Sequence, residues 1–361
     1  MAFGVYVHVP FCAHRCDYCA FATWTGKEPL IGPYVDAVVS ELRGAELPPA
    51  TSVFFGGGTP SLLPGASLAR ILDHVGRAPG AEVTVECNPE TVDAGLLAHY
   101  RRAGVTRLSF GVQSMLPHVL GALGRRHDPA AVRRAVALAG DAGYGEHYSV
   151  DLIMGAAGET AGDWRASLDA VLGLDPAPSH VSAYGLTVEP GTPLAADAAR
   201  HPDPDDQADK YLCTDEVLGA AGLEWYEISN WARPGHECRH NQLYWAQQPY
   251  RGVGCAAHSM APEPGGGIRR WWNVRTPERY IRAVQEGGAV EAAGERLDAA
   301  TAAAEALQLA LRTRDGVPVG ALADDPLLDG LVERRDGRAV LTGRGRLLAN
   351  EVALRLVPVD G

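Results

Sequence analysis

Three cysteines stand within eight residues near the start of the chain. Cys12, Cys16 and Cys19 form a C-x₃-C-x₂-C pattern directly after a run of β-branched residues. Thiolates are soft ligands that favour iron–sulfur clusters or zinc. Three close cysteines without an obvious nearby fourth fit a 4Fe–4S cluster with one iron left open to another ligand. A structural zinc ion normally takes four protein ligands, and His8 or His14 could supply the fourth, so zinc stays an alternative.

The other four cysteines are scattered, and the total of seven is odd. A chain of 361 residues with this spacing is not a disulfide framework, which favours a reducing compartment and a metal site. We see no secretory signal and no apolar run of roughly 20 residues, so we expect a cytoplasmic protein. The net charge of −12 argues against nucleic acid as a partner.

Strand-like and helical segments alternate through the first half of the chain. The predicted strands are Val5–Val9, Ser52–Phe55, Glu82–Glu86, Arg107–Phe110, Tyr148–Met154 and His180–Leu186. The predicted helices between them are Tyr34–Arg43, Leu68–Val75, Val92–Ala103, Ala130–Ala142 and Trp164–Leu172. This alternation predicts an α/β fold with a parallel sheet covered by helices, either an open sheet or an incomplete barrel.

Polar or glycine-rich residues follow every predicted strand. Gly57 and Gly58 follow the second, Glu86 ends the third, Gln113 follows the fourth and Asp151 lies in the fifth. Ligands of parallel α/β folds bind at the carboxyl ends of the strands, so we expect these residues to gather at one site. Burying an unpaired carboxylate in a strand costs free energy, which favours a functional role for Asp151.

The rest of the chain is less regular. We expect a surface loop at Asp197–Asp206, a helix at Gln207–Ala221, a segment rich in aromatics and histidine at Trp225–His258, and an irregular stretch around Gly265–Gly267 and Trp271-Trp272. From about residue 295 we expect helix Ala299–Leu311, a hairpin turning at Asp336-Gly337 and a last helix Arg344–Arg355, an order typical of a winged-helix-like α+β domain. Residues 295–361 hold 9 arginines and 11 acidic residues, so a DNA-reading role is disfavoured.

Several motifs together resemble a known superfamily. The segment Tyr6–Phe21 reads YVHVPFCAHRCDYCAF, and FGGGTPSLL, VECNPE, RLSFGVQS, GRRH and DLIMG follow in order. This series resembles the radical S-adenosylmethionine (SAM) proteins, in particular the branch shared by oxygen-independent coproporphyrinogen III dehydrogenases and HemW haem chaperones. The resemblance implies a partial (β/α)₆ barrel with the cluster at its mouth. It also implies that SAM binds the open iron, where an electron from the cluster cleaves a C–S bond of the sulfonium.

The same resemblance assigns roles to individual residues. It places Tyr6, Tyr18, Gly57, Gly58, Thr59 and Glu86 around SAM, and Gln113, Arg125 and Asp151 around a second SAM. For Arg125 the alternative is a solvated helix end beside Arg126. The chain departs from the family after Gly155, where Ala156-Ala157 replaces the usual Leu-Pro and puts the shape of that loop in doubt.

Three features favour the chaperone branch over the dehydrogenases. The first strand begins within five residues of the start, without the long extension typical of the dehydrogenases, and no cysteine stands two residues after Cys19. His240, Asn241, Tyr244 and Trp245 form an H-N-x-x-Y-W pattern similar to the HemW signature. Haem iron prefers an imidazole or thiolate ligand, so we expect His240 to bind haem, with Cys238, His236 and His258 as rivals. The alternative to haem binding is a structural role, in which Asn241, Tyr244 and Trp245 close a loop against the barrel and His240 caps a helix.

We therefore expect a haem chaperone that delivers haem to proteins such as respiratory enzymes, with transient membrane contact. It would need a low-potential electron donor and would lack coproporphyrinogen dehydrogenase activity. That dehydrogenase is the enzyme alternative, and a transcriptional regulator is a weaker one. The expected domains are a barrel core at residues 1–195, a connecting region at 196–294 carrying the haem segment, and the winged-helix-like domain at 295–361.

Overall fold

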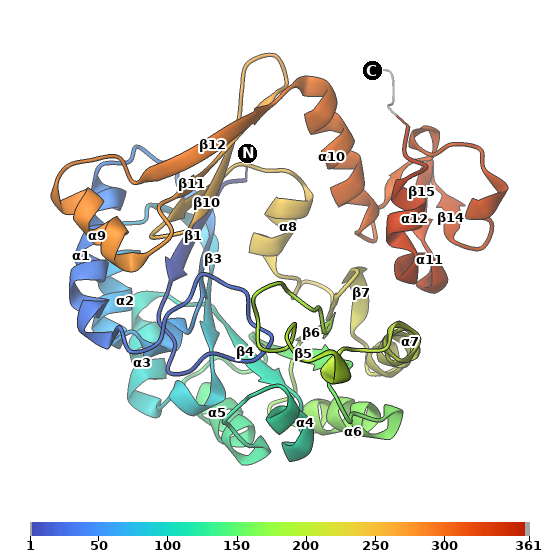
Figure 1. Cartoon of the computed structure of the whole chain (residues 1–361), viewed down its shortest axis with the longest axis horizontal. Helices are drawn as coiled ribbons and strands as arrows, with labels where there is room; N and C mark the ends of the chain where they lie inside the picture. Colours follow the sequence, from blue (N-terminus) through green and yellow to red (C-terminus); the bar gives the residue numbers. More distant parts are fainter. Residues whose placement is uncertain (1, 358–361) are drawn as a thin grey trace.

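The computed structural model of the chain describes residues 2–357. Six parallel strands lie side by side in chain order and curve into a partial barrel (Figure 1). They are β1 (Gly4–Val9), β2 (Ala50–Gly57), β3 (Arg77–Cys87), β4 (Arg107–Gln113), β5 (Tyr148–Met154) and β6 (His180–Gly185). All six were predicted, and the expected barrel fold is confirmed.

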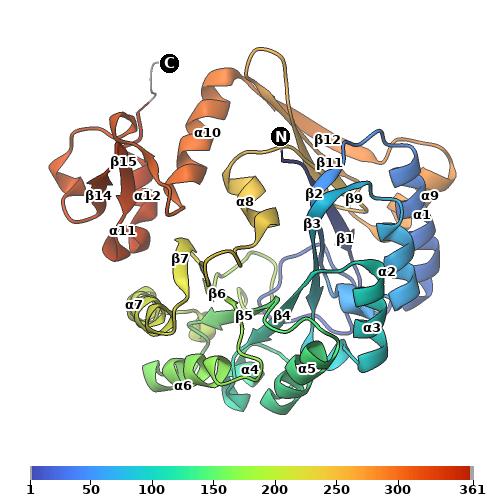
Figure 2. The same ribbon diagram turned by 180° about the vertical axis from the view of Figure 1, so that it is seen from behind.

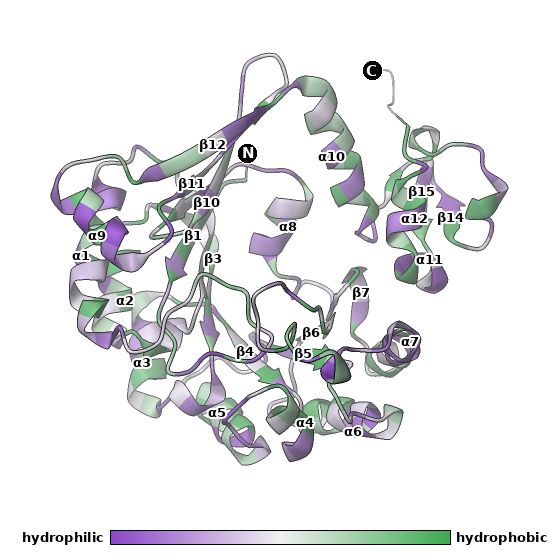
Figure 3. Cartoon of the chain, in the orientation of Figure 1, coloured by the Kyte–Doolittle hydropathy of each residue, from purple (hydrophilic) through white to green (hydrophobic). Residues whose placement is uncertain are grey.

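Further strands extend the sheet beyond both ends of the barrel. Past β6 lies β8 (Asn230–Ala232), antiparallel to β6, and then β7 (Glu224–Glu227), antiparallel to β8. Past β1 lie β9 (Tyr250–Val253), parallel to it, and then β10 (His258–Pro262), β11 (Ile268–Asn273) and β12 (Glu291–Leu297). The outermost strand on this side, β12, is exposed and carries Glu291, Glu295 and Arg296, and these charges discourage pairing with another chain (Figure 3).

The prediction of an irregular stretch around Gly265–Gly267 and Trp271-Trp272 was wrong. Gly265 and Gly266 have positive φ angles and form the turn between β10 and β11. Trp271 and Trp272 lie in β11, where each pairs with a residue of β10. Glycines supply the turn and aromatic residues the strand, so these residues have the composition of a hairpin.

Helices cover the outer face of the sheet (Figures 1 and 2). They are α1 (Ile31–Arg43), α2 (Gly65–Leu72), α3 (Ala94–Ala103), α4 (Pro117–Ala122), α5 (Pro129–Asp141), α6 (Ala161–Leu172) and α7 (Pro204–Ala220), with α9 (Pro277–Gln285) beside α1. Asp93, Asp128 and Thr160 accept hydrogen bonds from the first turns of α3, α5 and α6, which explains where these helices begin.

The two faces of the barrel strands differ in chemistry. The outward residues are apolar and at most 1% exposed, namely Val5, Val7, Val9, Val53, Phe55, Val83, Val85, Leu108, Phe110, Val150, Leu152 and Val181. The inward residues line a cavity and are mostly polar, namely Tyr6, Thr84, Glu86, Arg107, Ser109, Ser149, Asp151, His180 and Ser182. The apolar core therefore lies between sheet and helices, and the barrel interior, called the lumen below, is a polar cavity.

A short helix and a small domain complete the chain. Helix α8 (Arg239–Trp245) lies inside the curve of the sheet, between its two ends (Figures 1 and 2). Helix α10 (Ala299–Leu311) leads to a three-stranded sheet of β13 (Val317–Pro318), β15 (Arg338–Leu341) and β14 (Val332–Arg335) with its own apolar cluster. The predicted hairpin turn is present, while the predicted last helix divides into α11 (Gly343–Leu347) and α12 (Ala349–Ala353).

The proposed boundaries at residues 195 and 294 separate segments that share one sheet, because β7 to β12 extend the barrel on both sides. Within residues 2–357, the structure contains no helix with the length and apolarity to cross a bilayer.

Candidate functional site

The three predicted cluster cysteines lie together at one end of the lumen. The loop that follows β1 carries Cys12, Cys16 and Cys19, and all three line a cavity of about 800 Å³. They are free thiols, and each is partly buried. The loop is held at its start by the Cys12 amide, which donates to the carbonyl of Trp24 at 3.0 Å.

Side-chain donors from across the cavity reach the sulfurs of Cys12 and Cys16. Thr59 Oγ1 donates to Cys12 Sγ at 3.7 Å, and Arg125 Nη1 donates to Cys16 Sγ at 3.5 Å. Burial raises the pKa of the Cys12 and Cys19 thiols. Metal ligation requires the thiolate, and a metal-bound thiolate sulfur accepts hydrogen bonds such as those from Thr59 and Arg125. The loop therefore fits a 4Fe–4S cluster.

The donor set fits a single zinc ion less well. In the described part of the chain, no group of three or more His, Cys, Asp or Glu side chains converges on a point suited to one metal ion. Of the two histidines considered as a fourth ligand, His8 already uses both ring nitrogens, with Tyr6 Oη at 3.1 Å and the Ala22 carbonyl at 2.9 Å. His14 Nε2, by contrast, has no hydrogen-bond partner in the described residues, so it is the lack of a converging ligand set that disfavours zinc.

The two predicted glycines are required by the cluster loop itself. Gly57 has a φ of +106°, and a Cβ there would lie 2.4 Å from the ring of His8. A Cβ on Gly58 would lie 2.6 Å from the Phe11 carbonyl and 3.1 Å from Cys12 Sγ. The absent side chains let this segment pack against the loop, and their contact with SAM stays a prediction.

Glu86 and Asp151 are the two predicted carboxylates, and both face the lumen. Glu86 Oε2 accepts from the Gly57 amide at 3.1 Å, and Ser109 Oγ donates to Asp151 Oδ2 at 2.8 Å. Burial, and then the charge of Asp151, raises the pKa of Glu86 to about 8. Burial also raises the pKa of Asp151. Neither forms a salt bridge within residues 2–357, although the charge of Arg107 acts on Asp151, so a cationic ligand would favour their charged forms.

The remaining predicted residues also line the cavity. Tyr6 stacks on Phe54 and lies on the β1 side, and burial raises its pKa, as it does that of Tyr18 in the cysteine loop. Gln113 ends β4 with a positive φ of 65°. Arg125 follows α4 and is anchored by Asn88 Oδ1 and the Gly111 carbonyl, each at 2.9 Å. The structure thus brings every predicted SAM residue to the one cavity.

Sequence reasoning missed the lower part of the lumen. Thr84, Arg107 and His180 are at most 7% exposed, and each has a side-chain nitrogen or oxygen with no hydrogen-bond partner within residues 2–357. The nearest charge to Arg107 Nη1 is Glu82 Oε2, at 4.0 Å. The signal was in the sequence: polar residues alternate with apolar ones in β3 to β6, a period-2 pattern with the polar face inward.

Known proteins are similar to this chain in sequence. Residues 6–171 match the model of the radical SAM superfamily. The heme chaperone HemW of Mycobacterium tuberculosis is 43% identical and covers 98% of this chain and 95% of its own length. The heme chaperone HemW of Escherichia coli is 37% identical over 77% of this chain and 75% of its own length. This chain belongs to the HemW family.

The fold has a relative among solved structures. Coproporphyrinogen III oxidase (HemN) from Escherichia coli has a TM-score of 0.82 with 22% identity, covering 98% of this chain and 89% of that chain. At this identity the likeness concerns the fold alone. It confirms that the barrel and the C-terminal domain follow the architecture of a radical SAM enzyme.

The HemW-like segment lies on α8, inside the curve of the sheet. His240 is 1% exposed and lines the lumen. Its Nδ1 is 2.8 Å from Ser52 Oγ and its Nε2 is 2.9 Å from Tyr244 Oη, while the ring stacks on Phe54. Burial lowers its pKa to about 3, so the ring is neutral. Iron could reach Nε2 only after the Tyr244 hydroxyl has moved.

Other residues of this segment have structural partners. Glu82 on β3 accepts from the backbone amides of Arg239 and His240, at 3.3 and 3.2 Å, and so fixes the start of α8. Trp231 is fully buried, and its Nε1 donates to Asp215. Ser52, which no motif singled out, holds the His240 ring through Nδ1.

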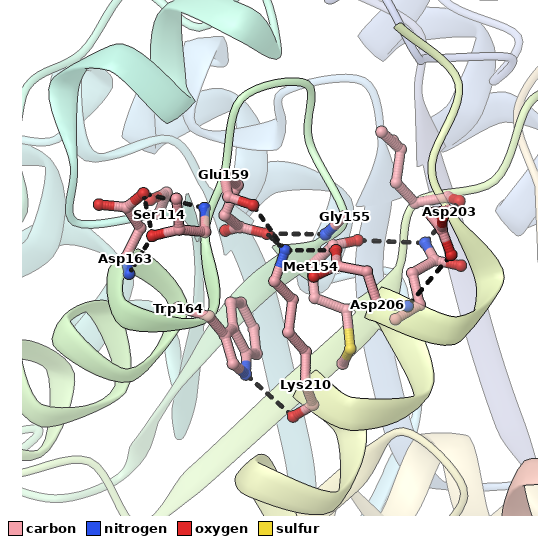
Figure 4. Close-up of polar contacts among 12 residues, drawn as sticks. Ser114, Met154, Gly155, Glu159, Asp163, Trp164, Asp203, Asp206 and Lys210 are labelled. Carbon is pink, nitrogen blue, oxygen red and sulfur yellow. Dashed lines mark hydrogen bonds and ion pairs between the residues drawn. The ribbon is translucent and has the colours of Figure 1, made fainter.

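The loop after β5, which departs from the family pattern, is held by a buried ion pair (Figure 4). Lys210 Nζ lies 3.1 Å from Glu159 Oε2 and 2.6 Å from Asp206 Oδ2, and it donates to the Glu159 carbonyl at 2.9 Å. Glu159 in turn accepts from the Gly155 amide at 2.7 Å. The Gly155-Ala156-Ala157 loop is therefore fixed by α7 rather than by a proline.

Proposed function

We propose that this chain is a haem chaperone that carries a SAM-ligated 4Fe–4S cluster. The observation that carries the proposal is the 43% identity to a heme chaperone HemW over nearly the full length of the chain. The three loop cysteines of this chain also lie at a polar lumen. Haem proteins, respiratory enzymes among them, would accept the cargo. A low-potential donor would reduce the cluster.

Cys12, Cys16 and Cys19 would hold the cluster, which when bound supplies an electron to the sulfonium of SAM. Tyr6, Tyr18, the Gly57–Thr59 segment and Glu86 would bind SAM, and Gln113, Arg125 and Asp151 would bind a second molecule. A cationic ligand suits Glu86, because opposite charge offsets the desolvation that raises its pKa. His240 would ligate haem iron once Tyr244 Oη has moved from Nε2.

The cluster is tested by changing its ligands. Cys12→Ala, Cys16→Ala and Cys19→Ala together should abolish bound iron and the broad absorbance at about 400 nm typical of 4Fe–4S clusters. Cys213→Ala is the matched control, because Cys213 is also a partly exposed free thiol but lies on α7. Full iron content in the triple variant would refute the cluster assignment.

The cargo is tested by titrating the anaerobic, cluster-loaded protein with haem and following the Soret band. We expect saturable binding of haem and transfer to an apo-haem protein. With SAM and a reductant, the same protein should not convert coproporphyrinogen III to protoporphyrinogen IX. Multiple turnover in that assay would overturn the chaperone proposal in favour of the dehydrogenase.

A further inference from the structure

Three polar side chains connect two of the cluster cysteines through hydrogen bonds. Arg125 Nη1 donates to Cys16 Sγ at 3.5 Å, and Arg125 Nη2 donates to Asn88 Oδ1 at 2.9 Å. Asn88 Nδ2 donates to Thr59 Oγ1 at 3.2 Å, and Thr59 donates to Cys12 Sγ at 3.7 Å. We call this chain of contacts the Arg125–Asn88–Thr59 bridge.

The bridge is built from separate parts of the barrel. Thr59 follows β2, Asn88 follows β3 and Arg125 follows α4. Asn88 is the central member, since its carbonyl faces Arg125 and its amide nitrogen faces Thr59. No motif assigned it a role, although its position at the end of a parallel strand is where ligand-directed residues are expected.

Arg125 is held firmly in this arrangement. Besides Asn88, Nη2 donates to the Gly111 carbonyl at 2.9 Å and lies 3.3 Å from His127 Nδ1. His127 Nε2 lies 3.0 Å from the Val112 carbonyl, so Nε2 carries the proton and Nδ1 accepts. The two hydrogens of Nη2 are engaged by Asn88 Oδ1 and the Gly111 carbonyl, so Nη1 is left for Cys16. Nε has no partner in the described residues, which leaves one donor for another ligand.

The three cysteines therefore have unequal surroundings. Cys16 receives a donor from a cationic guanidinium, and Cys12 receives one from a neutral hydroxyl. Arg15, the charged residue next to Cys19, donates to the Cys19 backbone carbonyl rather than to its sulfur. Reduction adds a negative charge to a cluster, and nearby positive charge and N–H or O–H donors stabilise the reduced form more than the oxidised one.

We propose that the Arg125–Asn88–Thr59 bridge raises the reduction potential of the cluster, with Arg125 as the main donor and Asn88 as the positioning residue that orients Arg125 and Thr59. The proposal rests on the cluster assignment of the preceding subsection. It goes beyond a SAM-binding role for Arg125 and Thr59, because it predicts an effect when SAM is absent.

The test is a redox titration of the reconstituted full-length protein without SAM, followed by the electron paramagnetic resonance signal of the reduced cluster. Iron and sulfide content are measured first for each variant. Arg125→Gln should shift the midpoint potential to more negative values, and Asn88→Ala should give a smaller shift in the same direction. Thr59→Val, which keeps the shape but loses the hydroxyl, should shift it least among the three.

Two matched controls separate the bridge from general charge effects. Arg126→Gln removes the same charge one residue away, at an exposed side chain, and should leave the potential nearly unchanged. Thr59→Ser restores a hydroxyl donor and should restore the native potential. Arg125→Lys keeps the positive charge but loses the forked guanidinium, so its midpoint potential should lie between those of the native and Arg125→Gln proteins.

The outcomes are distinguishable. Native potentials in fully loaded Arg125→Gln and Asn88→Ala proteins would overturn the bridge while leaving the cluster assignment intact. Equal shifts in Arg125→Gln and Arg126→Gln would also overturn it, since charge alone would then explain the effect. A native protein that binds no iron through Cys12, Cys16 and Cys19 would overturn both proposals.

Discussion

Buried carboxylates occur in two settings in this barrel, and they differ in their partners. Glu159, beneath the loop after β5, lies 3.1 Å from the ammonium of Lys210. Glu86 and Asp151 face the lumen without a salt bridge in the described residues; the Gly57 amide and the Ser109 hydroxyl donate to them, and Arg107 acts on Asp151 only through its charge. A buried charge paired inside the protein stabilises a loop, whereas one without a charged partner is held ready for a ligand. The motifs in the sequence do not separate the two, because both are acidic residues near strand ends.

Removing Lys210 should give the largest effect on stability. Lys210→Met leaves Glu159 buried without its partner, which should lower the free energy of unfolding by about 3 kcal/mol. Equilibrium denaturation in urea measures this loss. Lys210→Met/Glu159→Gln removes both charges and should recover much of it. SAM affinity should stay native in both variants, and a large loss of affinity would show that the pair belongs to the ligand site.

In the ligand-free protein, both ring nitrogens of His240 have hydrogen-bond partners. His240→Ala removes hydrogen bonds to Ser52 and Tyr244 and the stacking on Phe54, so stability should fall by about 2 kcal/mol. If His240 is the haem ligand, the Soret band of this variant should shift or disappear, while Tyr244→Phe should bind haem at least as tightly as the native protein. An unaltered Soret band in a folded His240→Ala protein would make the residue purely structural.

Glu86→Gln should weaken SAM binding without destabilising the fold. Gln keeps the acceptor for the Gly57 amide but cannot offer a charge to a cationic ligand. We expect SAM affinity to fall about tenfold, the loss of one charge-assisted contact. Equilibrium binding to the anaerobic, cluster-loaded protein measures this. Native SAM affinity together with reduced stability would reverse the comparison and place Glu86 among the structural carboxylates.

The smallest expected effect is on the pH dependence of the free energy of unfolding. The pKa of Glu86 is about 8 in the ligand-free folded protein and about 4.3 in an unfolded chain. Between these values the folded state keeps a proton that the unfolded state has lost, so this group lowers stability as pH rises from about 4.3 to 8. Glu86→Gln should therefore gain more stability over native at pH 8 than at pH 5, as measured by urea denaturation. Equal gains at both pH values would contradict the raised pKa.

Much of the site was predictable because it lies at strand ends. The six parallel strands, the cysteine loop and all the proposed SAM residues appear where the alternating pattern and the motifs placed them. The hydrogen bonds to cysteine sulfurs were not predictable, since Arg125 lies 109 residues from Cys16 and Thr59 lies 47 residues from Cys12, and they meet only in the folded barrel. His240 was predicted as a haem ligand, but local sequence could not reveal that Ser52, 188 residues away, occupies one ring nitrogen.

The sequence by itself determined the elements and the chemical types. Alternation of apolar and polar residues sets which strand face packs under helices, and cysteine spacing indicates a metal site, because both depend on near neighbours in the chain. The tertiary structure alone decided which buried groups are partnered. Lys210 reaches Glu159 and Asn88 reaches Thr59 across different elements, and only closure of the barrel sets those distances and leaves Glu86 and Asp151 facing the cavity.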